Sequence, residues 1–234
     1  MTGTLINIAA ILIGSTLGLV FGARLSKRLK NTVTIGLGLF TLSIGISMFL
    51  KSEEVLIVLG GLLIGAMLGE WWRIEEGLNN VGSWLEAKVG KKNNSAESER
   101  FIRGFMTASL LFCIGPLSIL GSIQDGLSGN YELLAVKSVL DGFASLAFAS
   151  TLGIGVAFSV FIVLIYQGGI SLLAVQLSSF ITEPMMTEMT AVGGVILIGL
   201  AISSLLEIKK IRVGSFLPAL AVAPLIVWIL SLFP

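Results

Sequence analysis

The chain has 234 residues, of which 55% are hydrophobic and only 12% are charged, with a formal net charge of +1 at pH 7. A soluble domain of this size carries about 25% charged residues, so the composition excludes an ordinary soluble protein. The small net charge gives no reason to expect nucleic-acid binding. The chain has no histidine and one cysteine, Cys113. We therefore expect no disulfide, no metal centre, no cofactor and no enzyme that depends on a histidine base.

Long apolar runs predict membrane-spanning helices, because a helix needs about 20 apolar residues to cross a bilayer. In chain order, six runs meet this requirement: 4–23, 32–50, 55–72, 104–123, 189–206 and 213–234. The only charge within them is Glu70, beside Trp71 and Trp72. An aromatic pair suits the headgroup level, so we interpret Glu70 as interfacial.

A further stretch, 133–182, is too long for one crossing, and its only interruption is the glycine-containing segment 152–155. Two crossings, 133–151 and 154–175, would bring the total to eight. A single crossing would bring it to seven, and the distribution of charge decides between the two counts.

Basic residues are concentrated in three gaps between the apolar runs. Residues 24–30, 73–103 and 209–212 hold 13 of the 15 Lys and Arg residues. Cytoplasmic loops retain Lys and Arg, so all three gaps should face the cytosol, which requires an even number of crossings between them. The sequence therefore predicts an all-α membrane protein with eight spans and extracytoplasmic termini. Glu183 and Glu188 would then lie in an outer loop.

The second basic gap contains a segment with helical periodicity that is too polar to cross. Apolar residues recur at helical spacing within 74–90, at Ile74, Leu78, Val81, Leu85 and Val89. This pattern predicts an amphipathic helix that lies on the cytosolic membrane surface. Residues 91–100 are polar and are predicted to form a linker.

Three predicted helices share a local pattern, at 9–14, 60–65 and 193–199. Two of them carry glycines four residues apart, Gly14, Gly18 and Gly22 in one and Gly61, Gly65 and Gly69 in the other. Such ladders are packing surfaces first, and they leave homo-oligomerisation open. The pattern fits internal duplication, and it also fits chance likeness between apolar helices. We expect one multi-pass domain, 1–234.

One ionisable pair, Lys137 and Asp141, lies inside a predicted span. Asp141 is about 12 Å from the start of its helix at 1.5 Å per residue, close to the bilayer midplane. Charges at this depth are costly and are usually functional. The two residues are four apart and can pair, and Ser145 extends the same polar face. The alternative is a neutralised pair that only fixes helix packing.

Other polar positions surround this pair in the sequence. Gly115-Pro116 interrupts a span and frees backbone carbonyls at membrane depth, as in the broken helices of transporters. Gln124 and Asp125 follow towards the outer face, where Asp125 either guards a vestibule or forms an Asp-Gly turn. Gln167 could face Asp141 or bond to a neighbouring backbone. A bound sodium or calcium ion at the two acids is a weaker alternative.

Several short motifs resemble a known family. They are FCIGP at 112–116, GSIQDG at 121–126, KSVLDG at 137–142, GIGV at 153–156, YQG at 166–168 and FLPAL at 216–220. Together they resemble the YqgA/YdfK-like family of bacterial inner-membrane proteins, which is classed as a domain of unknown function. The resemblance implies a bacterial plasma membrane location and a single multi-pass domain. Family members are sometimes labelled transport proteins, without an assigned substrate or site residues.

Two functions fit these patterns. The first is a transporter or channel for a small solute or ion, with Asp141 as the ion or proton carrier or the substrate anchor. Lys137 would tune its charge, and Gly115-Pro116 would supply carbonyls. The second is a non-transporting scaffold or regulator that acts through its glycine ladders and the cytosolic segment 74–100. An intramembrane enzyme is disfavoured by the lack of histidine.

Overall fold

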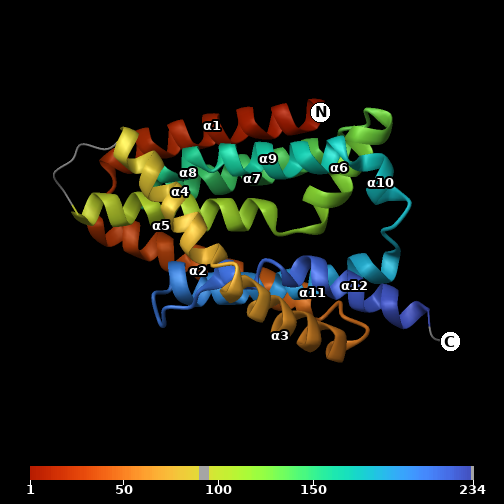
Figure 1. Cartoon of the computed structure of the whole chain (residues 1–234). Helices are drawn as coiled ribbons and strands as arrows, with labels where there is room; N and C mark the ends of the chain where they lie inside the picture. The colour runs from red at the N-terminus through yellow and green to blue at the C-terminus, as the bar shows by residue number, and fades with distance from the viewer. Residues whose placement is uncertain (90–94, 233–234) are drawn as a thin grey trace. The chain divides into compact units, whose positions relative to one another are not determined.

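The computed structural model describes residues 1–89 and 95–232, and every regular element in these ranges is helical (Figure 1). Six helical stretches of the described residues, three of them made of two consecutive elements, are each long and apolar enough to cross a membrane. Two bent helix pairs raise the number to eight if each pair forms one span. The predicted all-α membrane architecture is therefore confirmed, with six to eight candidate spans, and the bounds of the eight predicted spans stay a prediction.

The helices form two compact units, each built from two separate stretches of chain. Unit 1 contains Met1–Leu37 and Asn79–Ser179, and unit 2 contains Gly38–Leu78 and Phe180–Pro234. The boundaries fall inside α2 (Lys27–Phe49) and α4 (Ile74–Val89). Neither unit is a continuous segment, and the single multi-pass domain expected from the sequence stays a prediction.

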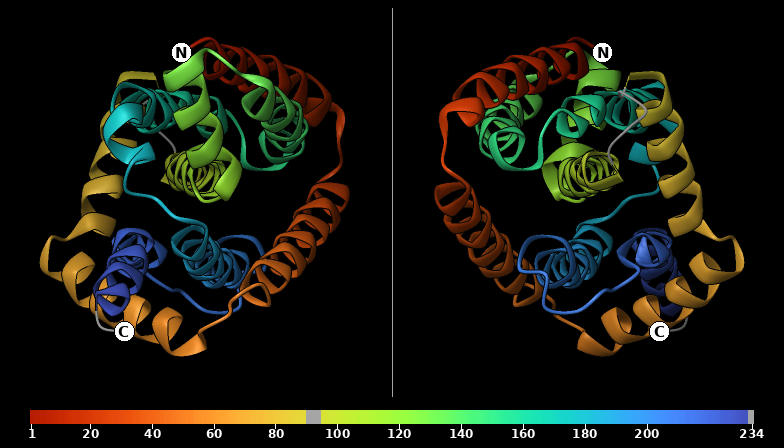
Figure 2. Two further views of the ribbon diagram at one scale, coloured as in Figure 1. Left: turned by 90° about the vertical axis from the view of Figure 1, so that its right-hand side faces the viewer. Right: turned by 90° about the vertical axis from the view of Figure 1, so that its left-hand side faces the viewer.

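Unit 1 contains the first part of α2, the second part of α4 and seven further helices. These are α1 (Thr2–Arg24), α5 (Ser95–Cys113), α6 (Pro116–Ser128), α7 (Glu132–Leu152), α8 (Gly155–Phe158), α9 (Val160–Leu172) and α10 (Ala174–Ser178). The helices α1 and α7 lie side by side (Figure 2). They run in parallel, because Gly14 faces Gly142 and Gly22 faces Ser150. A Cβ atom on Gly22 would lie 2.6 Å from the Ser150 carbonyl oxygen, so only glycine permits this approach.

Unit 2 contains the remainder of α2 and α4, with α3 (Val55–Trp71), α11 (Glu183–Leu200), η1 (Ala201–Leu205), η2 (Val213–Phe216) and α12 (Ala219–Ser231). The second glycine ladder packs α3 against η2 and α12. Gly61 faces Ala223 and Gly65 faces Ala219, so α3 and α12 are antiparallel. Both ladders are therefore packing surfaces, as predicted. Whether they descend from a duplication stays a prediction.

The predicted span 104–123 is broken in the structure. α5 ends at Cys113 and α6 begins at Pro116, with a bend of 64° between them. Proline is favoured at the first helical position, where its missing N–H costs nothing. The prediction of a linker over 91–100 is wrong for residues 95–100, which are helical because α5 begins at Ser95. Residues 91–94 lie outside the described residues.

The amphipathic helix α4 has the predicted extent, but protein covers part of its apolar face. Leu85 is buried with Phe101 and Phe105 of α5 in unit 1. At this position the helix therefore packs on a neighbouring helix, and its place on the membrane surface stays a prediction. Val81 and Trp84, by contrast, are exposed.

Candidate functional site

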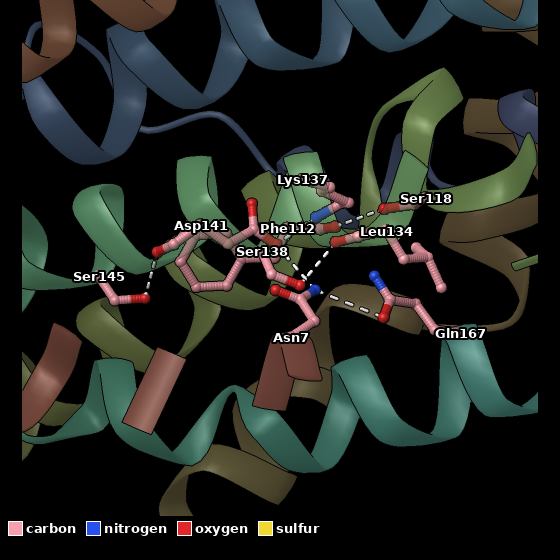
Figure 3. Close-up of polar contacts among 9 residues, drawn as sticks. All are labelled: Asn7, Phe112, Ser118, Leu134, Lys137, Ser138, Asp141, Ser145 and Gln167. Carbon is pink, nitrogen blue, oxygen red and sulfur yellow. Dashed lines mark hydrogen bonds and ion pairs between the residues drawn. The ribbon is translucent and has the colours of Figure 1, made fainter. Parts of the chain in front are cut away.

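The polar residues of α7 line its buried side within unit 1. Lys137 and Asp141 are one helical turn apart and form an ion pair (Figure 3). Their exposed fractions are only 6% and 8%. Because burial strips water from both charges, each depends on the other for neutralisation. The predicted pairing is therefore present.

Two amide side chains from other helices extend the ion pair. Asn7 of α1 donates from Nδ2 to Asp141 Oδ2 at 3.0 Å and to Gln167 Oε1 of α9 at 3.4 Å. Asn7 and Gln167 are fully buried. Gln167 thus faces the Asp141 side of unit 1, as one of its two alternatives predicted. The four residues, Asn7, Lys137, Asp141 and Gln167, are called the polar cluster below.

Asn7 was missed by the sequence analysis. Its signal was present, because it is an amide inside an otherwise apolar predicted span, and a buried amide requires hydrogen-bond partners. Charges are costlier than amides in a membrane, so Lys137 and Asp141 give the stronger signal in the sequence. The 134 residues that separate Asn7 from Asp141 also concealed their contact.

The polar cluster retains unused hydrogen-bonding capacity. Asn7 Oδ1 and Gln167 Nε2 have no hydrogen-bond partner among the described residues. Buried polar atoms are nearly always paired in folded proteins, so these two atoms need an explanation. They offer one acceptor and one donor, next to a carboxylate, to a further small polar group.

The serines on α7 play a smaller part than the sequence suggested. Ser138 donates to the Leu134 carbonyl and Ser145 donates to the Asp141 carbonyl, each at 2.6 Å. Both hydroxyl groups therefore bond back to their own helix, a common arrangement for serine in apolar surroundings. Ser145 thus contacts the backbone of Asp141 but makes no hydrogen bond to the side chains of the polar cluster.

The helix break at Gly115 and Pro116 is connected to the polar cluster through Phe112. The Lys137 ammonium lies 5.9 Å from the centroid of the Phe112 ring, within cation–π range. The Phe112 carbonyl accepts a hydrogen bond from Ser118 Oγ at 2.8 Å. One carbonyl near the break is thus already occupied, although the sequence predicted that freed carbonyls would serve a ligand.

Asp125 and Gln124 lie apart from the polar cluster. Asp125 accepts the Gly3 backbone N–H at 3.0 Å and lies 3.2 Å from the Met1 α-ammonium group, with a fully buried side chain. It belongs to helix α6, so the turn interpretation is wrong, and its burial does not fit an open vestibule. Gln124 is exposed on the same helix.

Glu188 is a second position that the sequence analysis misplaced. It lies inside α11, is 3% exposed, and is not in an outer loop. Its carboxylate accepts Ser52 Oγ at 2.7 Å and the backbone N–H groups of Glu53 and Glu54 at 2.9 and 3.1 Å. An acid is favourable there because it lies beside the N-terminus of helix α3, just before which these N–H groups stand. Glu188 therefore closes the α2–α3 turn within unit 2.

Two further interpretations from the sequence concern the position of Glu70 and a bound cation. Glu70 is half-exposed and bonds to Arg212 at 2.7 Å and to Ser215 at 2.9 Å, at the end of α3. Across residues 1–89 and 95–232, no three acidic or cysteine side chains gather into a group that could hold a metal ion. A sodium or calcium ion held by two acids and backbone carbonyls is a different kind of site and stays a prediction.

Comparison with known sequences gives a family without an assigned activity. Residues 2–228 match the family described as "Protein of unknown function (DUF554)". The "Uncharacterized membrane protein YdfK" of Bacillus subtilis (strain 168) is 31% identical over 237 residues, which cover 100% of this chain and 98% of the relative. The "Uncharacterized protein YqgA" of Escherichia coli (strain K12) is 31% identical over 221 residues, with 94% of each covered. The resemblance found in the sequence motifs is thus confirmed, and no solved structure matches.

Proposed function

We propose that this chain, which belongs to the DUF554 family of proteins of unknown function, is a transporter or channel for a small solute or ion. The observation that carries the proposal is the polar cluster of unit 1. Three helices, α1, α7 and α9, contribute an ion pair and two amides to one buried point. A membrane protein that needed only stable packing would avoid this cost, because charges inside a bilayer are expensive.

The chemistry of the cluster suits exchange of one partner for another. Asp141 is neutralised by Lys137 and bonded by Asn7. A proton or cation that binds Asp141 would compete with Lys137, whose ammonium would then need a new partner. The unpaired atoms Asn7 Oδ1 and Gln167 Nε2 can contribute hydrogen bonds to a passing polar group. This gives Asp141 the carrier role and Lys137 the tuning role.

The charge distribution within each unit supports a plasma-membrane orientation with cytosolic basic ends. In unit 1, Arg100 at the start of α5 bonds to Thr151 at the end of α7, whereas Asp125 meets the start of α1. In unit 2, Arg212 meets Glu70, whereas Glu188 meets the α2–α3 turn. Each unit thus has a basic end and an acidic end. With basic ends retained in the cytosol, both termini would be extracytoplasmic.

Flux measurements in proteoliposomes test the transport proposal. Purified protein is exposed to concentration jumps of protons, Na⁺, K⁺ and a mixture of amino acids on a solid-supported membrane. We expect a current with at least one probe, and its loss in Asp141→Asn. The matched control is Glu132→Gln, which removes an exposed acid from the same helix. Equal currents in Asp141→Asn and wild type would eliminate the proposed role of the cluster.

One observation favours the second candidate function, a non-transporting scaffold or regulator. In unit 1, Val81 and Trp84 are exposed on α4, with 41% and 56% of their surface accessible. Exposed aromatic residues are typical anchors in protein interfaces. The double variant Val81→Ser/Trp84→Ser tests this role without removing the buried Leu85. Loss of one stoichiometric cross-linked partner, with no current from wild type for any probe, would favour it.

A further inference from the structure

Unit 1 contains a cavity at the end where its basic residues gather. Its volume is about 310 Å³, near the lower limit for small-ligand sites. The cavity is bounded by the last turns of α1 and α7, the residues Gly153 and Ile154, and side chains from α2, α4 and α5. It lies away from the polar cluster along α1, because its α1 residues are 19, 22 and 23 whereas the cluster uses residue 7.

Four charged side chains line this cavity, two of each sign. Arg100 and Lys30 supply the cations, and Glu86 and Glu97 supply the carboxylates. Arg100 is held in place because its Nε donates to the Thr151 carbonyl at 2.9 Å. Glu86 is held by Ser98, whose hydroxyl donates to it at 2.6 Å. The charged lining is therefore partly ordered before any ligand binds.

The remaining two charges are available to a ligand. Lys30 is half-buried, and its ammonium makes no hydrogen bond or ion pair with any described residue. Glu97 is exposed at the rim. Two cations and two carboxylates around one small cavity suit a ligand that carries both charges. A dianion would be repelled by the carboxylates, and a simple cation would be repelled by Lys30 and Arg100.

The surroundings of the cavity point to the membrane as the source of such a ligand. The cavity lining includes apolar residues that are accessible: Leu19 of α1 is half-buried, and Ala23 of α1 and Ile154 are exposed. Apolar side chains at the end of a membrane helix can cover acyl chains. Basic pockets between membrane helices commonly hold lipid headgroups.

We propose that this cavity binds the phosphoethanolamine headgroup of a zwitterionic phospholipid. Arg100 and Lys30 hold the phosphate, and a guanidinium and an ammonium suit this group because both make charge-assisted hydrogen bonds to its oxygens. Glu86 and Glu97 accept hydrogen bonds from the primary ammonium. The acyl chains leave the cavity past Leu19, Ala23 and Ile154. The site is separate from the proposed transport function, and its test does not use flux.

The test is lipid binding to the purified full-length chain in detergent, measured by native mass spectrometry and by thermal stabilisation. The probes are phosphatidylethanolamine, phosphatidylglycerol and free O-phosphoethanolamine. We expect phosphatidylethanolamine to bind about tenfold more tightly than phosphatidylglycerol, since the second lipid lacks the ammonium and its charged hydrogen bonds. Equal binding of the two lipids would overturn the proposal. Tighter binding of O-phosphoethanolamine than of either lipid would overturn the proposal that the ligand is a membrane lipid.

Variants assign the binding to this cavity. Lys30→Gln should lower the affinity for phosphatidylethanolamine about tenfold, and Glu97→Gln should remove most of the preference over phosphatidylglycerol. Neither side chain makes a hydrogen bond or ion pair with another described residue, so both variants should fold. The control is Lys27→Gln, which removes an exposed charge from the same basic gap but does not line the cavity. Equal losses in Lys30→Gln and Lys27→Gln would place the lipid elsewhere.

Discussion

At the residue scale, the ion pair of Lys137 and Asp141 has a structural role and a proposed functional role, which experiments can separate. The pair has a structural value, because it neutralises two charges that are more than nine-tenths buried. It has a proposed functional value, because Asp141 would exchange partners during transport. Removing one partner affects both values, whereas removing both partners affects mainly the second.

The structural value is tested by single and double variants. Asp141→Asn leaves the Lys137 ammonium buried without a counter-charge and should lower the free energy of unfolding by about 3–5 kcal/mol. The double variant Lys137→Met/Asp141→Asn should recover most of this loss, because no buried charge remains. Thermal unfolding in detergent measures both. Recovered stability without recovered flux would separate function from packing, and no recovery would mean that the carboxylate has another essential partner.

Glu188 gives a second prediction at this scale. Glu188→Gln keeps the shape of the side chain but weakens three hydrogen bonds to the α2–α3 turn. We expect a loss of about 1–3 kcal/mol in the free energy of unfolding. The control is Glu183→Gln, an exposed acid on the same helix, which should change stability very little. Equal thermal midpoints for both variants would contradict the assigned role.

The places and partners of single residues were the hardest features of this protein to predict from the sequence. Lys137 and Asp141 could be found because charges inside an apolar run are rare. Asn7 and Glu188 could not be placed, because their roles depend on partners about 135 residues away in the sequence. Glu188 also looked like a loop residue, since a helix of membrane length could begin either before or after it.

At the element scale, the glycine ladder of α1 should be intolerant of larger residues. Gly22→Val would place side-chain atoms against the Ser150 backbone, where even a Cβ lies 2.6 Å from the carbonyl oxygen. Overpacking of this kind costs about 1–3 kcal/mol, and the detergent-solubilised protein should unfold at a lower temperature. The control is Gly36→Val in α2, where an added Cβ meets nothing within 4 Å. A Gly22→Val variant as stable as Gly36→Val would refute the close packing of α1 on α7.

The helices themselves were largely predictable, and the exceptions have physical causes. Hydrophobic length located the six candidate spans and the apolar parts of the two bent helix pairs. It could not show that Gly115-Pro116 would divide one of them, because proline is compatible with either a kink or a new helix start. Amphipathic periodicity located α4, but it could not distinguish lipid from Phe101 and Phe105 as the surface that covers Leu85. Both surfaces are apolar.

At the scale of the whole molecule, the prediction concerns the sides of the membrane on which the basic gaps lie. In a background where buried Cys113 is replaced by serine, single cysteines are introduced at Arg28, Lys210 and Asn130. In intact cells, an impermeant maleimide should label Asn130→Cys and leave Arg28→Cys and Lys210→Cys unlabelled until the membrane is permeabilised. The charge rule is the physical reason. Labelling of Arg28→Cys but not Lys210→Cys in intact cells would disprove the eight-span arrangement.

The arrangement of the chain into two units lay beyond the sequence. Parity and charge predicted how often the chain crosses, but they carry no information about which helices pack together. Glycine ladders indicated where close packing occurs without naming the partner helix. The partners, α7 for α1 and α12 for α3, became evident only from the structure.

The parallel packing of α1 on α7 also has a consequence for how the protein is made. Asn7 leaves the ribosome 134 residues before Asp141, which at 5–20 residues per second is a delay of roughly 7–27 s. During this interval the nascent chain holds a hydrophilic amide in its first hydrophobic segment while the helix that will satisfy it has not been synthesised. Biogenesis of this protein should therefore depend on a companion, either the translocation machinery or a membrane chaperone, that shelters the first helix until the fifth span arrives.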